Sequence, residues 1–600
     1  MVTSLLPWVF ASFFILPSSG KLYQNPSQLV KTDYDYIVVG AGAGGAVVAA
    51  RLSEDPRISV LLVEAGISNE GITDVAIPLM GLSLTPNTML DWNFTTTPQP
   101  GLNNRAIAYP RGRLLGGSTS VNYMVYMRGS EDDFNRYASV TKDSGWKWDH
   151  MQQYAQRNEN LVSPGDQHNT TGQLIPSQHS TSGAISVSLA GNPTPIDSRV
   201  IATTRELSDE FPFNPDMVGG NILGIGWSFA SIGNGTRSSS AVGYLAPAAG
   251  RSNLDVVINA QATKLEVTGK VRNVPSFRRV LVTEKAGAPV LALTAKHEII
   301  LSAGTFGTPT LLQLSGIGDR NELRAAGVAT VVHNPSVGKN MSDHALLPNV
   351  WNVNSSDTYD SVLRNPDEFK VSLAQWTKDR TGPLGSHITN NLGWLRLPKT
   401  ASIFKTTHDP AAGPKSSHFE MLFVNMWVNP NVPPPPTGNF MSVVLALISP
   451  TSRGSIKITS SNPFAKPLIN PNLVATDFDI FTLVEAVKAA KRFVSAKAWK
   501  GYIQDAVGGL ETAKTDKQIE AYVRENTNTI WHAVGTAAMS AKGANYGVVD
   551  PDLKVKGVDG LRVVDGSILP FVPNAHTEGP IYLIAERGAD LIKKDFRPHP

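Results

Sequence analysis

The folded part of the chain opens with short apolar runs separated by a helical segment. Residues 36–39 form one run, a glycine-rich stretch follows, residues 46–53 have helical character, and residues 59–63 form a second run. Strands without hydrophobic–polar alternation are typical of parallel sheets buried on both faces. The strand–helix–strand order therefore predicts an α/β fold with a doubly wound, Rossmann-like sheet. Similar runs occupy residues 254–258, 297–302 and 561–564, so we expect this domain to be discontinuous in sequence.

The middle of the chain has a different pattern and predicts a second domain. Residues 441–448 and 454–459 have the character of neighbouring strands, and residues 478–498 carry apolar side chains at helical spacing. Four prolines at 433–436 mark a stiff loop. We expect residues 33–345 and 530–598 to form the first domain, with insertions. Residues 346–529 are expected to form the second, an antiparallel sheet flanked by helices.

A glycine-rich turn connects the first predicted strand to the first predicted helix. Gly40, Gly42 and Gly45 form the pattern G-x-G-x-x-G, and Glu64 ends the following strand. The glycines allow a tight turn and let the backbone approach a pyrophosphate at the helix N-terminus, while the carboxylate suits a ribose hydroxyl. The motif predicts a dinucleotide with an unphosphorylated ribose. It does not distinguish NAD from FAD.

The composition excludes several other chemistries. The 600 residues include no cysteine, which excludes disulfides, thiolate metal sites and a cysteine nucleophile. Charged residues make up only 17% of the chain and the net charge is +3, a balance that does not favour nucleic-acid binding. No H-E-x-x-H pattern is present, and we expect no metal site.

The first twenty residues predict a targeting segment. An apolar run at residues 5–16 is too short to span a bilayer and is followed by small residues, as in a cleaved signal peptide. A buried N-terminal strand or helix is the alternative. Glycosylation sequons occur at Asn93, Asn169, Asn234, Asn340 and Asn354. We therefore expect a secreted, extracellular glycoprotein that does not associate with a membrane.

Longer motifs carry a resemblance to a known enzyme family. Residues 112–122 (GRLLGGSTSVN), 304–318 (GTFGTPTLLQLSGIG), 337–344 (VGKNMSDH) and 574–576 (NAH) are similar to signatures of the glucose–methanol–choline (GMC) oxidoreductase family, which binds FAD. The similarity extends from about residue 35 to residue 591. Within the family, residues 107–112 and 548–554 most resemble the fungal aryl-alcohol oxidases. The resemblance implies FAD as the cofactor.

The resemblance also implies which residues contact FAD. Besides the glycine motif and Glu64, these are Arg113, Gly117, Ser118, Asn122, Ala262, Asp565 and Gly566. The turn at 116–119 offers N–H groups and hydroxyls that suit a flavin edge or a phosphate, although a plain loop would have the same composition. Family members with covalently attached flavin have histidine at the position of Val121. Valine cannot form that bond, so we expect FAD to be bound non-covalently.

Two of the 12 histidines match the active-site positions of the family. His532 lies in an apolar and aromatic setting, where an unpaired polar ring would be costly, and His576 follows the Asp565–Gly566 turn. Oxidation of an alcohol requires a base with a pKa near the working pH, and histidine meets this requirement. We expect His532 to be the base and His576 to orient the substrate hydroxyl.

The predicted substrate pocket is aromatic and poor in charge. Its candidates are Tyr123, Trp531, Trp427 and Val428, a lining that favours aryl or allylic primary alcohols over a sugar. Trp531 stands where aryl-alcohol oxidases usually have phenylalanine, Val428 where a loop aromatic is expected, and Ala533 where proline is common. The preferred ring substitution is therefore left open.

These observations together predict a secreted, FAD-dependent aryl-alcohol oxidase that forms an aldehyde and H2O2. The peroxide could supply peroxidases, as in lignin degradation, and nothing requires more than a monomer. One alternative is a dehydrogenase of the same family that reduces quinones or a heme partner and oxidises alcohols or sugars. The others are a non-redox hydroxynitrile lyase that contains flavin and a non-enzymatic flavin-binding protein.

Overall fold

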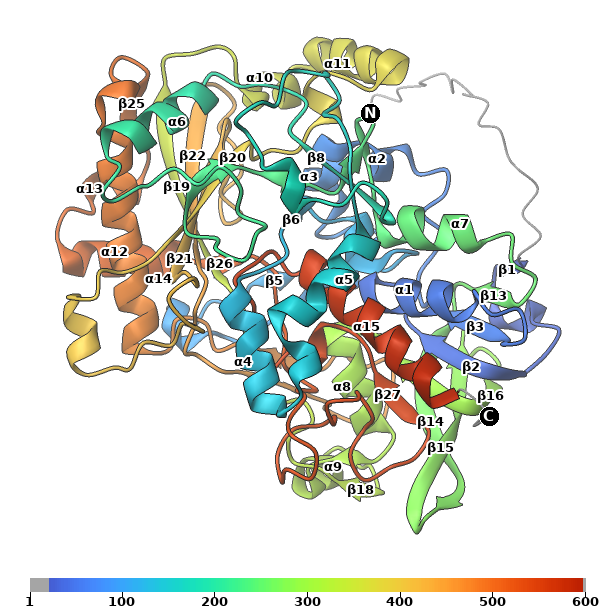
Figure 1. Cartoon of the computed structure of the whole chain (residues 1–600). Coiled ribbons are helices and arrows are strands. Elements are labelled where there is room, and N and C mark those ends of the chain that lie inside the picture. Colours follow the sequence, from blue (N-terminus) through green and yellow to red (C-terminus); the bar gives the residue numbers. More distant parts are fainter. Residues whose placement is uncertain (1–20, 597–600) are drawn as a thin grey trace, which may run out of the picture.

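The computed structural model describes residues 21–596. The predicted signal peptide, residues 1–20, lies outside this range. Within it, no helix combines the length and the apolar character needed to cross a bilayer. The two largest sheets of the described residues lie side by side, each covered by helices (Figure 1).

The first sheet has eight strands and a parallel centre assembled from distant parts of the chain. Its order is β1 (Lys21–Tyr23), β13 (Leu254–Val257), β3 (Val60–Val63), β2 (Asp33–Val39), β16 (Leu291–Leu301), β15 (Val274–Thr283) and β14 (Gln261–Val271), with β27 (Leu561–Val563) also paired to β16. In register, Ile37 pairs with Leu61, and Ile299 pairs with Leu561. Each predicted run of this domain forms one of these strands, so the α/β prediction is confirmed.

Two helices cover one face of this sheet. Helix α1 (Ala43–Leu52) follows the glycine turn, begins three residues before the predicted start, and packs against α15 (Glu578–Phe596) (Figure 1). Val47, Val48 and Leu52 of α1 are completely buried. Helix α8 (Gly304–Leu314) follows β16. The first residues of α1 and α8 both lie at the carboxyl ends of parallel strands, where ligands bind in sheets of this kind.

The second sheet has seven strands, with every pairing antiparallel. Its order is β25 (Ile503–Ala506), β19 (Ala345–Val353), β22 (Phe440–Leu447), β21 (Phe419–Val424), β20 (Asn391–Leu395) and β9 (Gly224–Trp227), with β26 (Asn528–Thr529) also paired to β19. Strand β9 enters this sheet from a much earlier part of the chain. Helices α12 (Asp477–Val494) and α14 (Asp516–Asn526) pack together on its outer side (Figure 1).

One expectation about this sheet is wrong. The predicted run 441–448 is β22, but the run 454–459 does not pair with it. Strand β23 (Ser455–Lys457) forms a separate antiparallel hairpin with β24 (Leu468–Asn470) and contacts α8. Gly454 bridges to Met341 just before the hairpin, and a side chain at Gly454 would lie 1.9 Å from the Asn470 carbonyl oxygen. This close backbone contact directs the strand toward the first domain.

A buried ionic cluster ties together four segments of the chain that come between β3 and β9. His179 contacts Glu159 through Nδ1 at 2.5 Å and Asp216 through Nε2 at 2.9 Å, and Arg128 donates to Glu159 at 2.6 Å. A carboxylate on each ring nitrogen requires two N–H donors, so the ring is an imidazolium. Although burial opposes the charge, the hydrogen bonds to Asp216 and Glu159 raise the pKa of His179 to about 9.

This cluster predicts a loss of stability at alkaline pH. The folded-state pKa of His179 is raised, so its contribution is complete below the unfolded value of about 6.5. It is lost as the pH rises through about 9. The melting temperature of the wild type should therefore fall over this interval by roughly a few degrees more than that of His179→Gln. The exposed His150→Gln variant is the control, and identical pH profiles for wild type and His179→Gln would contradict the prediction.

Candidate active site

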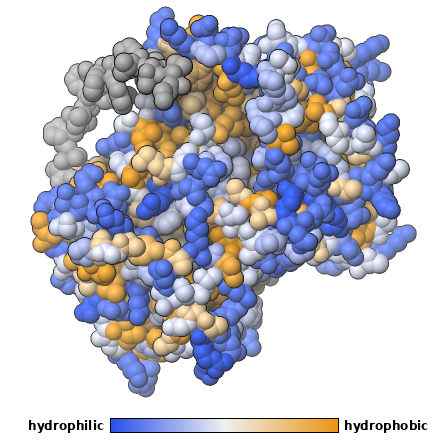
Figure 2. Space-filling model, turned by 180° about the vertical axis from the view of Figure 1, so that it is seen from behind, coloured by the Kyte–Doolittle hydropathy of each residue, from blue (hydrophilic) through white to orange (hydrophobic). Residues whose placement is uncertain are grey.

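A cavity of about 1500 Å³ lies between the two sheets. Val39, Gly40 and Glu64 line it from the first sheet, and Leu422 and Val444 line it from the second. Most residues expected to form the site also line it: Gly42, Gly117, Ser118, Asn122, Ala262, Asp565, Gly566, Tyr123, Trp427, Val428, Trp531, His532 and His576. Gly45 and Arg113 are the two expected residues that are not part of its lining. Figure 2 shows further apolar side chains in hollows of an otherwise mostly hydrophilic face.

The glycine turn forms a backbone cradle at one end of this cavity. Gly40 has a φ of +100°, and a Cβ at Gly45 would lie 1.8 Å from the Gly40 carbonyl oxygen. Gly45 therefore serves the close packing of helix on strand. A Cβ at Gly117 would lie 2.8 Å from the Cα of Gly42. The turns at 40–45 and 116–120 thus approach each other at the N-terminus of α1, where no side chain caps the helix.

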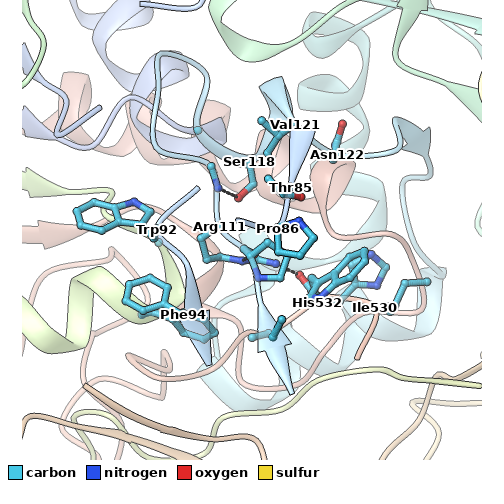
Figure 3. Close-up of a pocket in the computed structure, with 18 of the residues that line it drawn as sticks. Thr85, Pro86, Trp92, Phe94, Arg111, Ser118, Val121, Asn122, Ile530 and His532 are labelled. Carbon is cyan, nitrogen blue, oxygen red and sulfur yellow. Dashed lines mark hydrogen bonds between the residues drawn. The ribbon is translucent and has the colours of Figure 1, made fainter. Parts of the chain in front are cut away.

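This cradle fits the phosphates of FAD. Uncapped N–H groups at a helix N-terminus favour an anion. Arg113 lies over the Trp92 ring at 5.1 Å, and its Nε is buried without a partner among the described residues. Ser118 Oγ accepts from the Gly112 N–H at 3.1 Å (Figure 3), which fixes the second turn beside the cavity. Among residues 21–596, no three His, Asp or Glu side chains are grouped as metal ligands would be.

The two expected carboxylates of the cradle organise its backbone. Glu64 accepts hydrogen bonds from the N–H groups of Ala41 at 2.9 Å and Gly66 at 2.8 Å. Asp565 accepts from the Gly304 N–H at 2.9 Å and from Thr308 Oγ1 at 2.6 Å, at the start of α8. Burial raises the pKa of both carboxyl groups.

His532 is held at the opposite end of the cradle by a buried carboxylate. Its backbone N–H donates to Asp343 Oδ1 at 2.9 Å, while Tyr109 and Thr529 donate to Asp343 Oδ2. The preceding residue has a left-handed backbone, and Arg111 donates to its carbonyl oxygen beside His532 (Figure 3). Burial and the positive charges nearby lower the pKa of His532 well below 6.5. Its ring is therefore neutral, and its pKa is lower than the residue type alone predicts.

His576 lies opposite His532 and is paired with a glutamate. The two rings are 4.7 Å apart and nearly perpendicular, and His576 Nε2 lies 3.0 Å from Glu420 Oε1. Glu420 is fully buried on β21. Sequence reasoning missed this residue, although a carboxylate inside the apolar run FEMLFV could have indicated it, because buried carboxylates need a partner. A proton on His576 would disfavour a second one on the adjacent His532 ring, which contributes to the lowered pKa of His532.

Strand alternation gives the second sheet one face for its own core and one for the cavity. Phe419, Met421 and Phe423 of β21 join the core under α12. The opposite face of the sheet carries an apolar cluster with Leu346, Leu422, Val424, Met426 and Val444, against which Ile530 and Val428 pack. Tyr123 and Trp531 add an edge-to-face aromatic pair with centroids 5.8 Å apart. Trp427 also stacks edge-to-face on Phe440 at 5.1 Å.

Asn122 lies in a buried network that sequence reasoning did not find. Arg237 donates to its carbonyl oxygen at 2.7 Å and to its Oδ1 at 2.8 Å, and its Nδ2 donates to Glu578. Burial raises the pKa of Glu578 to about 7. Arg237 and Glu578 come from segments far from Asn122 in the chain, and neither belongs to a motif. The network fixes the Asn122 side chain at the edge of the cavity.

Comparison with known proteins agrees with this geometry. Residues 34–346 and 450–585 match the N-terminal and C-terminal parts of the GMC oxidoreductase family. The chain is 38% identical over 589 residues to the dehydrogenase eriK of Hericium erinaceus, covering 96% of both proteins. It is also 38% identical to pyranose dehydrogenase 3 of Leucoagaricus meleagris, covering 96% of this chain and 95% of the relative.

A solved structure extends the similarity to the fold. A fungal aryl-alcohol oxidase superposes with a TM-score of 0.80 at 25% identity, over 94% of this chain and all of the other. Three observations lead to one conclusion: two domains match the family, the relatives span nearly the whole chain, and the cradle fits FAD. The chain belongs to the GMC oxidoreductase family and is a flavin oxidoreductase that acts on a small substrate.

Proposed function

We propose that this enzyme oxidises apolar primary alcohols, aromatic and allylic ones in particular, to aldehydes. The observation that carries the proposal is a neutral His532 facing a His576–Glu420 pair within an apolar and aromatic wall. Such a wall binds a flat apolar alcohol by burial and ring packing. It offers few hydrogen-bonding groups to a sugar.

The residues divide the chemistry between them. His532 takes the hydroxyl proton, and His576 donates a hydrogen bond that orients the alcohol oxygen. Glu420 holds the His576 ring in place through Nε2, while the apolar wall excludes water from the reacting carbon. Bound FAD supplies the redox chemistry by accepting the hydride from that carbon.

The electron acceptor is proposed from the relatives. Because relatives at 38% identity are named dehydrogenases, we propose that an organic acceptor such as a quinone reoxidises the enzyme. An oxidase that produces H2O2 is the second candidate, supported by the shared fold with an aryl-alcohol oxidase. Pyranose oxidation is a second candidate for the substrate, supported by the similarity to pyranose dehydrogenase 3.

Anaerobic reduction of the flavin tests the proposed reaction. A benzylic alcohol and an aliphatic dienol should bleach the flavin absorbance faster than glucose does. His532→Ala should retain FAD but lose about 10²–10⁴-fold in the rate of flavin reduction, because a general base contributes on that scale. The exposed His150→Ala variant should behave as wild type. Failure of every alcohol to bleach the flavin would support the lyase alternative, and a preference for glucose would overturn the substrate class.

A comparison of turnover with a quinone and H2O2 release in air shows whether a quinone or O2 is the electron acceptor. Faster turnover with the quinone and little H2O2 is the expected result. Stoichiometric H2O2 in air, without stimulation by quinone, would favour the oxidase.

Glu420 provides a second test of the mechanism. Glu420→Gln keeps a hydrogen-bonding group beside His576 but removes the carboxylate charge there, so kcat should fall roughly 10²-fold while FAD stays bound. Glu511→Gln, at an exposed position, is the matched control. Unchanged kcat in Glu420→Gln, measured at saturating alcohol, would show that this charge has no part in the reaction.

FAD is proposed to be bound without a covalent bond. Val121 lies at the end of the turn 117–120 and lines the cavity, and its side chain has no nucleophilic atom. Acid precipitation should therefore release the flavin into the supernatant. Flavin retained in the precipitate would contradict this proposal.

We also propose that the protein is secreted and carries glycans at Asn169 and Asn234. Both are exposed, and among the described residues neither amide nitrogen donates a hydrogen bond. Asn93 and Asn340 instead donate from Nδ2 to the carbonyl oxygens of Thr88 and Pro570. Recovery of the protein from culture medium checks secretion, and glycopeptide mapping of that protein checks for glycans at Asn169 and Asn234.

A further inference from the structure

His344 lies directly behind His532 and has no part in the chemistry described so far. It is fully buried and immediately precedes β19. Its Nδ1 lies 2.9 Å from Nδ1 of His532, and its Nε2 lies 3.1 Å from the carbonyl oxygen of Ile448. The two rings meet edge to face at 5.2 Å.

The hydrogen-bond partners of His344 determine where its single proton resides. A carbonyl oxygen can only accept, so His344 Nε2 must carry the hydrogen. Burial and the charge of His576 lower the pKa of His344 to about 3, and the ring is therefore neutral. A neutral imidazole has one N–H group, so His344 Nδ1 is an acceptor.

This arrangement in turn determines the tautomer of His532. Two nitrogen lone pairs facing each other at 2.9 Å would repel, so His532 Nδ1 must carry a hydrogen and donate it to His344. The neutral His532 ring then has its lone pair on Nε2. The backbone supports this geometry, because the Ile530 N–H donates to the His344 carbonyl oxygen at 3.1 Å.

We propose that His344 is a positioning residue that fixes the Nδ1–H tautomer of His532 and leaves Nε2 as the atom that accepts the substrate proton. This inference rests on the proposed function, in which His532 is the base. The alcohol transfers its hydroxyl proton to Nε2, and the two electrons of its C–H bond leave with the hydride to bound FAD. The products are an aldehyde, a reduced cofactor and an imidazolium at His532.

The other groups that face His532 do not replace this role. The Asp343 carboxylate accepts from the His532 backbone N–H, and Arg111 donates to the carbonyl oxygen of residue 531. His576 faces the ring from the cavity side and pairs with Glu420. Among the described residues, only His344 is hydrogen-bonded to a ring nitrogen of His532.

Two variants of His344 separate positioning from packing. In His344→Asn, the side-chain oxygen can still accept from His532 Nδ1–H. In His344→Leu, the side chain fills similar space but offers no acceptor. We expect His344→Leu to lose about 10²–10⁴-fold in anaerobic flavin reduction, the scale on which a general base contributes. His344→Asn should stay within about tenfold of wild type, and His150→Leu should match wild type.

A direct measurement of the tautomer does not depend on turnover. In holoenzyme labelled with 15N-histidine, the His532 signals are those lost in His532→Ala. Wild type and His344→Asn should show a protonated Nδ1 and an unprotonated Nε2, whereas His344→Leu should show a mixture of tautomers. FAD content and melting temperature confirm that each variant is folded. If His344→Leu does not fold, the wild-type spectrum alone decides the tautomer.

A His532 protonated at Nε2 in the wild type would overturn the inference. Flavin reduction in His344→Leu as fast as in wild type would also overturn it. If no alcohol reduces the wild-type flavin, the proposed function fails, whereas the spectrum still decides the tautomer. The two failures are therefore distinguishable.

Discussion

The active site depends on one buried carboxylate. Asp343 accepts hydrogen bonds from the His532 backbone, from Tyr109 and from Thr529, at 2.9, 2.7 and 2.6 Å. Tyr109 belongs to β5 (Ala108–Tyr109), beside the cofactor turns, and Thr529 ends β26 of the second sheet. A buried carboxylate is costly unless its oxygens are satisfied, so these donors must stay together. Burial still raises the pKa of Asp343 to about 6. The same set of bonds therefore joins the β4–β5 hairpin (Phe94–Thr95 and Ala108–Tyr109) to the second sheet and fixes His532 between them.

The second sheet contributes to the site through strand alternation. Odd-numbered residues of β21 complete a core under α12, while Leu422 and Val424 join the cluster on the cavity face. Glu420 interrupts the apolar character of this strand, and its position coincides with His576. A carboxylate placed here costs desolvation free energy unless it finds a hydrogen-bonding partner. Its presence on this strand is explained by the contact with His576 Nε2.

The sequence predicted the features that short segments determine by themselves. The glycine turn and the parallel strands lie in runs whose spacing or neighbours suffice to identify them, and both histidines were singled out because their segments resemble motifs of the family. Glu420 and His344 could not be assigned their roles in this way, because their partners lie 156 and 188 residues away along the chain. The predicted pairing of β23 with β22 failed for a related reason. Both runs have strand character, but the close backbone contact at Gly454 decides the partner, and no local pattern encodes it.

The chain is 38% identical to a pyranose dehydrogenase, yet one wall of its cavity is apolar. The two observations are compatible because the two ends of the cavity are built differently. At the cofactor end, a Cβ at Gly40, Gly44 or Gly45 would lie within 2.4 Å of a backbone oxygen. These positions therefore tolerate little change. The substrate end consists of side chains on one face of β19, β21 and β22, where a hydrophobic group of similar volume costs little stability. The side chains of this wall, rather than the overall identity, therefore determine which small substrate fits the cavity.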